Sequence, residues 1–158
     1  MRHAKSDYPT GVVDHDRPLA ARGIREAGLA GDWLRANLPA IDLVLCSSAT
    51  RTRQTLERTQ IDAPVTYSER LYHANAGTLI DEINQVAEDV ATVMVVGHEP
   101  TMSNVALGLA DPDSSEGDAA GRISMKYPTS AIAVLSVPGS WSGLQLSGAE
   151  LTAFHVPR

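Results

Sequence analysis

The feature that most constrains this chain is an alternation of short apolar segments with longer amphipathic ones. Residues 92–96 are the clearest strand, because apolar and β-branched side chains fill the segment, as in strands buried on both faces. Segments of strand character cover 41–46, 65–67, 92–96, 131–137 and 150–156, and segments of helical character cover 20–38, 50–59, 78–86 and 101–109. This alternation predicts an α/β fold, a three-layer α/β/α sandwich with a mostly parallel central sheet.

The longest predicted helix, 20–38, has one apolar side and one polar side. The apolar side carries Ile24, Ala27, Gly31, Leu34 and Leu38, and the polar side carries Arg22, Arg25, Glu26, Asp32 and Arg35. Pro39 is expected to end this helix. Ser48 is the predicted N-cap of the following helix, and the acidic, glycine-containing segment 111–121 is predicted to be a loop.

Length, charge and cysteine content exclude several classes of protein. A chain of 158 residues fits one domain, 1–158, and no apolar run is long enough to cross a bilayer, so we expect no membrane association. Cys46 is the single cysteine, which excludes an internal disulfide and favours a reducing cytoplasm. The net charge is −6 and no basic run occurs, which argues against nucleic acid as a partner. A site for an anion must therefore be small and local.

Two residues with the chemistry of an anion site follow predicted strands. Arg51 lies in the first turn of the helix after 41–46, and His98 comes directly after 92–96. Ligands of parallel α/β sheets bind beyond the carboxyl ends of the strands, and a helix N-terminus favours anions. Arginine and histidine at these positions indicate a phosphate site rather than a metal site.

Three segments resemble the motifs of a known family. Arg2-His3-Ala4 resembles the Arg-His-Gly motif of the histidine phosphatase (phosphoglycerate mutase-like) superfamily, and residues 47–55 and 96–100 resemble its second and third motifs. Their order and spacing match across nearly the whole chain. The short length and the segments 16–19 and 126–129 are most similar to the small SixA-type members, which dephosphorylate phosphohistidine on signalling proteins.

The resemblance implies a metal-independent phosphatase with no cofactor. His3 would be the nucleophile and would form a phosphohistidine intermediate, while Arg2, Arg51 and His98 would bind the phosphoryl group. Arginine suits this role because its forked donors match phosphate oxygens. Glu69 is the candidate general acid. The expected partner is a phosphorylated protein, carrying phosphohistidine, or a small phosphorylated metabolite.

Alternative readings remain for each of these residues. His98 could cap a helix, His3 could be a surface residue near the chain end, and Glu69 could be a solvated loop carboxylate. Arg53 is a rival of Arg51, but residues two apart on a helix point to different faces, so only one can reach the pocket. Lys5 is close enough to the first motif to line the pocket but is expected to face solvent. His15, His73 and His155 match no motif and are expected at the surface or in the core, and Trp33 and Trp141 are expected to be packing residues.

The chain departs from the family pattern in two places. Ala4 replaces the usual glycine, which removes freedom for a positive φ beside the nucleophile. No apolar strand precedes Arg2, so the first strand of the domain is expected to be missing or truncated, with His3 on a fraying end and activity impaired.

The short connection from Glu69 to Val93 leaves no room for a helical cap, which favours an open site. A non-catalytic phosphate-binding module and, less favoured, a phosphomutase are the rival functions.

Overall fold

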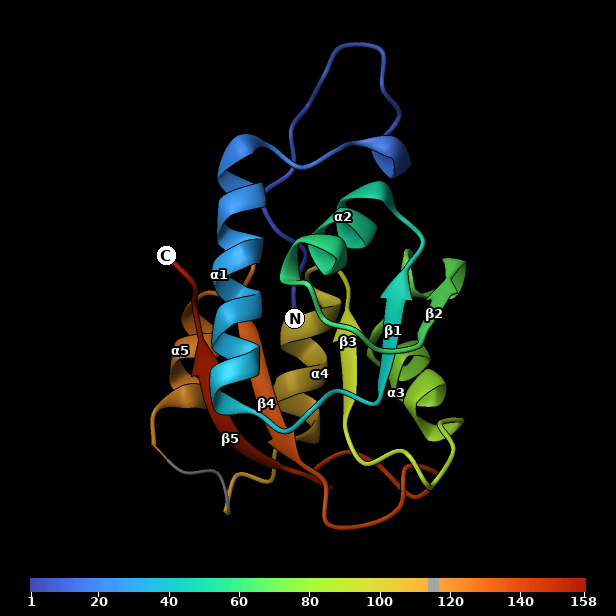
Figure 1. Ribbon diagram of the computed structural model, residues 1–158. Coiled ribbons are helices and arrows are strands. Elements are labelled where there is room, and N and C mark those ends of the chain that lie inside the picture. The colour runs from blue at the N-terminus through green and yellow to red at the C-terminus, as the bar shows by residue number, and fades with distance from the viewer. Residues whose placement is uncertain (114–116) are drawn as a thin grey trace.

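The computed structural model describes residues 1–113 and 117–158 (Figure 1). The elements are η1 (Asp14–Asp16), α1 (Ala21–Asn37), β1 (Leu43–Ser47), α2 (Thr50–Thr59), β2 (Val65–Ser68), η2 (Glu69–Leu71), α3 (Ala76–Asn84), β3 (Val93–Val96), α4 (Thr101–Leu109), α5 (Ala119–Met125), β4 (Ile132–Ser136) and β5 (Glu150–His155), where η marks a 3₁₀ helix. This order confirms the predicted alternation of strands and helices. No helix of the described residues has the length and apolarity to cross a membrane.

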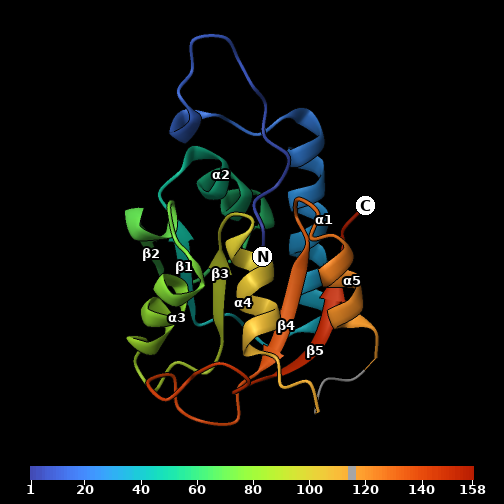
Figure 2. The same ribbon diagram turned by 180° about the vertical axis from the view of Figure 1, so that it is seen from behind.

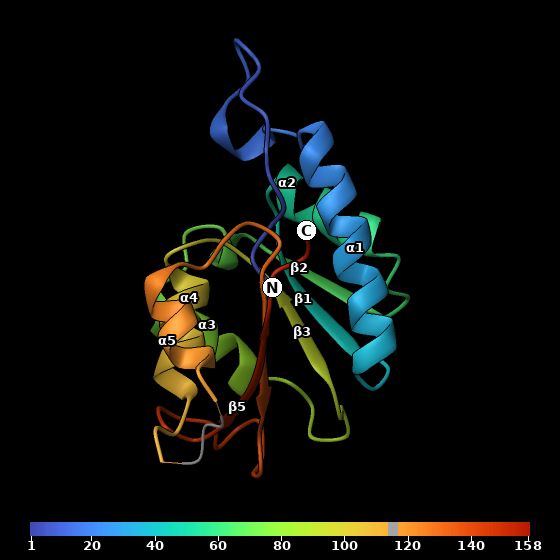
Figure 3. The same cartoon turned by 90° about the vertical axis from the view of Figure 1, so that its left-hand side faces the viewer.

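The strands form two hydrogen-bonded sheets that share one layer. β1 lies between β2 and β3 and runs parallel to both, whereas β4 and β5 pair antiparallel. Figure 3 shows α1 and α2 on one side of the strands and α3, α4 and α5 on the other. The three-layer α/β/α arrangement with a mostly parallel central part is therefore as the sequence predicts.

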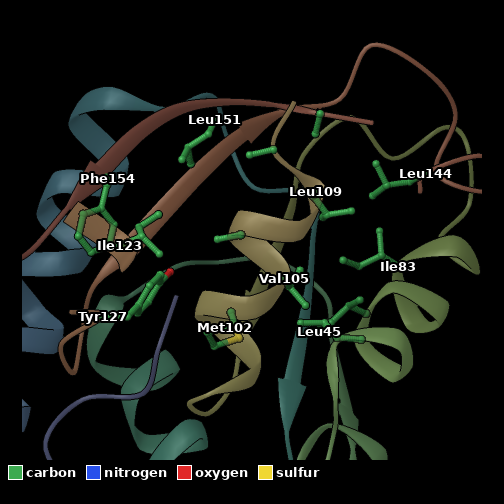
Figure 4. Close-up of a cluster of buried hydrophobic side chains, with 14 of the residues drawn as sticks. Leu45, Ile83, Met102, Val105, Leu109, Ile123, Tyr127, Leu144, Leu151 and Phe154 are labelled. Atoms are coloured by element: carbon green, nitrogen blue, oxygen red, sulfur yellow. The ribbon is translucent and has the colours of Figure 1, made fainter. Parts of the chain in front are cut away.

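The alternation of side chains along β1 builds a core on each face. Val44 and Cys46 are fully buried in a cluster with residues of α1 and α2, whereas Leu45 joins the larger cluster with α3 and α4. Successive strand residues point to opposite faces, so an apolar strand can serve both layers. Figure 4 shows the larger cluster, in which Met102 and Val105 of α4 lie among side chains from the surrounding elements.

The segment Met1–His3 joins the two sheets. Arg2 forms a parallel bridge with Gly97, and the N–H of His3 donates to the Gly97 carbonyl at 2.9 Å. On the other side, the N–H of Arg2 donates to the Ala131 carbonyl at 3.0 Å. Figures 1 and 2 both show the N-terminus between β3 and β4. Met1 is only 6% exposed. The expectation that His3 sits on a fraying end is therefore wrong, because backbone hydrogen bonds hold the segment inside the sheet layer.

An apolar cavity of about 540 Å³ adjoins Met1. Its walls include β3, β4 and α4, and the lining side chains include Met94, Val105 and Ile132. The Met1 ammonium donates to the Val95 carbonyl at 2.8 Å. Burial lowers the pKa of that ammonium to about 5, because removing a charge from water favours its neutral form.

Two details of the predicted helices are wrong. Glu26, placed on the polar side of α1, is 1% exposed, while Ile24, placed on the apolar side, is 41% exposed. Glu26 tolerates burial because Arg22 and Arg158 pair with it at 2.7 and 3.1 Å. Ser48 does not cap α2, since Ala49 occupies that position without a side-chain hydrogen bond.

The segment 111–121, predicted as a loop, contains the start of a helix. α5 begins at Ala119, and Ile123 anchors it in the core with 2% exposure. Residues 114–116 of the predicted loop lie outside the described residues. α3 begins two residues earlier than predicted, at Ala76, because the Asn75 side chain accepts a hydrogen bond from the Thr78 N–H and caps the helix.

Candidate active site

Three distant segments bring their functional side chains together at the carboxyl end of the parallel strands. His3 follows the short segment beside Gly97, His98 follows β3, and Arg51 lies in the first turn of α2 after β1. The ring centroids of His3 and His98 are 5.2 Å apart, with the ring planes tilted by 53°. Arg51 and Arg2 both act electrostatically on the two rings. The four residues that the motifs single out are thus neighbours in space.

The hydrogen bonding of His3 defines the state of its ring. Nδ1 lies 2.7 Å from the Ala4 carbonyl oxygen, which only accepts, so Nδ1 carries the proton and Nε2 has a free lone pair. Burial is the main reason that the pKa of His3 falls to about 3, and the charges of Arg51 and Arg2 add to this effect. His3 therefore presents a neutral imidazole whose Nε2 is a potential nucleophile.

The backbone at Ala4 fits the alanine. The Ala4 N–H donates to Thr55 Oγ1 of α2 at 2.8 Å, and the residue is fully buried. Among the described residues, the non-glycine positions with positive φ are Gln60, Ser130 and Ser147. Ala4 thus needs no left-handed conformation, and the replacement of glycine beside His3 imposes no backbone strain.

His98 is held with one ring nitrogen toward the protein. Nε2 lies 2.7 Å from Ser47 Oγ, while the buried Nδ1 has no partner in the described part of the chain. Burial, followed by the charge of Arg51, lowers the pKa of His98 to about 4. In the neutral tautomer in which Nε2 accepts from the Ser47 hydroxyl, Nδ1 carries the proton and is free to donate.

Arg51 and Arg2 each have one buried donor nitrogen, Nε, that lacks a hydrogen-bond partner among the described residues. The terminal nitrogens of Arg51 bind the carbonyl and the carboxylate of Asp14 at 2.8 and 3.2 Å, and a terminal nitrogen of Arg2 binds the Tyr127 carbonyl at 2.7 Å. The Nε atoms of both arginines are buried and make no hydrogen bond with any described residue. Arg53, in contrast, is exposed and lies over the Tyr67 ring at 4.3 Å. Of these two arginines of α2, Arg51 is therefore the one whose charge acts on the His3 and His98 rings.

Three of the buried donors that lack a hydrogen-bond partner among the described residues come from the three motif segments, one from each. They are Arg2 Nε, Arg51 Nε and His98 Nδ1. Leaving a buried donor unsatisfied costs about 1–3 kcal/mol, and more for a charged group. Such a set is suited to an anionic ligand with several acceptor oxygens, such as a phosphoryl group. No three histidine, cysteine or acidic side chains of the described chain gather where they could hold a metal ion.

Three residues at the edge of this site were not recognised from the sequence as functional. Asp14 accepts hydrogen bonds from Arg51 and Tyr72, and the bond from Tyr72 is the largest cause that lowers the pKa of Asp14. The same bond raises the pKa of the Tyr72 hydroxyl. The Tyr72 ring makes T-shaped contacts with the rings of His98 and His15, with centroid distances of 5.6 and 4.8 Å. The adjacent segment 16–19, which resembles SixA-type members, was the available signal for this loop.

Glu69 and Lys5 are not brought into contact with these side chains. Glu69 opens η2 and is exposed, and its side chain forms no hydrogen bond or ion pair within the described residues. Lys5 is also exposed, with its Nζ 5.7 Å from the ring of Tyr8. His155 lies far along the chain and stacks on Trp33 with a centroid distance of 4.5 Å. The expected packing role of Trp33 is thus confirmed.

Comparisons with known proteins agree with this geometry. Residues 1–95 match the model of the histidine phosphatase superfamily (branch 1). The uncharacterized protein Rv1276c of Mycobacterium tuberculosis (strain ATCC 25618 / H37Rv) is 63% identical over 158 residues, which cover 100% of both chains.

Solved structures of similar proteins extend the agreement to the whole chain. The candidate phosphohistidine phosphatase SixA from Nakamurella multipartitia is 40% identical with a TM-score of 0.91, covering 99% of this chain and 93% of that one. The candidate phosphohistidine phosphatase SixA from Agrobacterium tumefaciens is 28% identical with a TM-score of 0.82, covering 99% and 95%. The resemblance read from the three motifs is therefore correct, and this chain belongs to the histidine phosphatase superfamily, branch 1.

Proposed function

We propose that the chain is a phosphatase that forms a phosphohistidine on Nε2 of His3 and hydrolyses it without a metal ion. The observation that carries this proposal is the set of three buried donors, Arg2 Nε, Arg51 Nε and His98 Nδ1, which lack partners in the described chain and surround a neutral histidine. Membership of the superfamily supports a phosphatase, and the assignment of roles to these residues is ours.

The first step transfers the phosphoryl group to the protein. Nε2 of His3 attacks phosphorus as the bond to the leaving atom breaks, and the two arginines and His98 hold the equatorial oxygens. Phosphoryl transfer places its charge on these oxygens, so the catalytic contribution is positioning and electrostatic stabilisation. The hydrogen bond from Nδ1 to the Ala4 carbonyl keeps the reacting tautomer in place.

The second step releases phosphate. Water attacks the phosphorus of phospho-His3, the P–N bond breaks, and His3 regains its lone pair. Division of one difficult reaction into two easier ones is the general benefit of covalent catalysis. Because the site residues remain bound to the same oxygens, the same donors serve both steps.

The substrate we propose is a protein carrying phosphohistidine, with small phosphate monoesters as the alternative. Two structural relatives with 40% and 28% identity are described as candidate phosphohistidine phosphatases, which supports the first choice. Between Glu69 and Val93 the chain forms only η2 and α3, and Leu79 of α3 is buried in the core. An uncapped site is suited to a protein substrate.

A turnover assay with variants tests the proposal. The chain is incubated with p-nitrophenyl phosphate and with a phosphohistidine protein, each with and without chelator. We expect turnover that is unaffected by chelator and abolished in His3→Ala. Phosphate binding without turnover would contradict the enzyme and leave a binding module. Turnover that survives in His3→Ala would refute the assigned nucleophile.

A further inference from the structure

The proposed reaction includes a proton transfer that the four motif residues do not perform. The leaving atom of an ester with a poor leaving group, such as phenyl phosphate, must gain a proton, and the attacking water must lose one. The Nδ1 proton of His3 is held by the Ala4 carbonyl, and Nε2 of His98 is held by Ser47. Glu69, the candidate acid, is exposed and contacts none of these residues within the described chain. Another group must carry this proton.

A chain of hydrogen-bonding groups at the site edge has the required chemistry. Asp16 Oδ1 lies 3.1 Å from Nδ1 of His15, and Nε2 of His15 lies 2.9 Å from Ser48 Oγ. The carboxylate only accepts, so it fixes the Nδ1 proton and directs Nε2 toward the hydroxyl. Neutral His15 then accepts from Ser48, and protonated His15 donates to it.

The positions of these groups place the relay beside the anion site. Ser48 directly follows Ser47, which binds His98, and lies in the turn that leads to Arg51. The His15 ring packs edge-on against Tyr72, whose ring also meets His98. The side chain of His15 is 34% exposed, and Ser48 is half-buried. Both side chains are thus partly exposed to solvent.

We propose that His15 and Ser48 form the proton relay that serves the leaving group and the hydrolytic water. The inference rests on the proposed function, since it assigns the proton transfers of that reaction. Asp16 has the role of a positioning residue, because it acts through the imidazole of His15.

The two steps balance as follows. As the bond from phosphorus to the leaving atom breaks and the bond to His3 forms, the leaving atom takes the Ser48 hydroxyl proton. Ser48 regains a proton from Nε2 of protonated His15, which becomes neutral. When water attacks phospho-His3, one water proton passes through Ser48 to His15, and the remaining O–H stays on the released phosphate. The enzyme returns to its starting protonation state.

The charged and titratable groups around His15 come from several elements. Asp14 and Asp16 lie on η1 with His15 itself, and Arg17 follows them. Arg51 reaches Asp14 from α2, and Tyr72, with His73 packed on its ring at 4.1 Å, comes from the end of η2.

The test compares substrates whose leaving groups need different amounts of protonation. Rates for 2,4-dinitrophenyl, p-nitrophenyl and phenyl phosphate are measured for the wild type, His15→Asn, Ser48→Ala and the double variant. The matched control is His73→Asn, which removes a histidine that packs on Tyr72 but belongs neither to the relay nor to the four motif residues. Glu69→Gln tests the rival acid.

The relay predicts a loss that grows as the leaving group becomes poorer. Because general acid–base catalysis contributes about 10²–10⁴-fold, we expect about a 100-fold loss in kcat/KM for phenyl phosphate and about threefold or less for dinitrophenyl phosphate. The measured quantity is kcat/KM because it reports the first phosphoryl transfer alone, whereas kcat also contains the hydrolysis of phospho-His3, which is the same for all three substrates. His15→Asn, Ser48→Ala and the double variant should lose about the same, since members of one relay are non-additive. His73→Asn should keep the wild-type dependence on the leaving group.

Several outcomes would overturn the relay while leaving the phosphatase intact. An equal loss for all three substrates would mean that His15 and Ser48 only maintain structure. Additive losses would mean that the two residues act separately. A leaving-group-dependent loss in Glu69→Gln instead would assign the proton transfer to that carboxylate. Failure of the wild type to turn over both the three aryl phosphates and a phosphohistidine protein would refute the proposed function itself.

Discussion

Acid is expected to destabilise the folded protein through its buried histidines. The pKa of His3 is about 3 in the folded state, against an ordinary value of 6.5, and burial is the main cause. Between these two pH values the unfolded chain binds a proton that the folded chain does not bind. The contribution of His3 to the free energy of unfolding is therefore fully present above the unfolded pKa and is lost as pH falls from about 6.5 toward 3.

The size of the effect follows from the pKa difference. One pKa unit corresponds to about 1.4 kcal/mol, and pH 5 lies about 1.5 units below the unfolded value, so His3 alone costs about 2 kcal/mol at pH 5. His98, whose folded pKa is about 4, has the same sign. A loss of this size is a large part of the 5–15 kcal/mol that stabilises a typical domain.

Urea unfolding at pH 8 and pH 5 measures the free energy directly. The reference variant is His3→Gln, which keeps a polar side chain of similar size but does not titrate. The buffer must contain no phosphate or sulfate, because anion binding to the folded state adds stability of its own. The wild type should lose about 2 kcal/mol more than the variant between the two pH values. Equal losses would refute the argument that His3 is held neutral by burial.

Three further changes test the packing and the site. Gly31→Ala should lower the free energy of unfolding by about 1–3 kcal/mol, because the added Cβ would lie 2.1 Å from the Thr59 carbonyl oxygen at the end of α2. Gly28→Ala is the control, since its Cβ would meet open space and should not destabilise the fold. Equal effects of the two variants in urea unfolding would contradict this packing. Arg51→Ala should reduce kcat/KM at least about 100-fold while Arg53→Ala stays within about twofold, and a reversed order in the aryl phosphate assay would exclude the assigned pocket. An apolar strand-length segment fused before Met1 should raise Tm, because it converts a buried amino terminus to an amide and fills the adjoining cavity. An unchanged or lower Tm would show that the cavity does not accept a strand.

Most of the strands and helices were predictable because local pattern and tertiary burial agree. The apolar side chains of β3 pack in the core clusters on both faces of the sheet, and a solvent-exposed loop has no reason to contain such a continuous apolar run. Glu26 was misplaced because its partners are Arg22 and Arg158, and the second comes from the opposite end of the chain. The start of α5 was missed because its sequence is rich in small residues, and Ile123 alone anchors it.

The candidate site was predictable for the residues that belong to family motifs or directly follow predicted strands. Arg51 and His98 follow strands, so the topology alone predicts that they meet. Asp14, His15 and Tyr72 reach the site through contacts between loops, which have no periodicity that a sequence can reveal.

The position of the transferred phosphoryl group tests the central claim most directly. The chain is mixed with substrate, quenched in alkali within milliseconds, digested, and mapped by mass spectrometry. The account predicts an alkali-stable, acid-labile phosphate on His3 that disappears as substrate is exhausted and is absent in His3→Gln. Steady turnover with no phosphate on His3, or with the phosphate on His98 instead, would contradict the account.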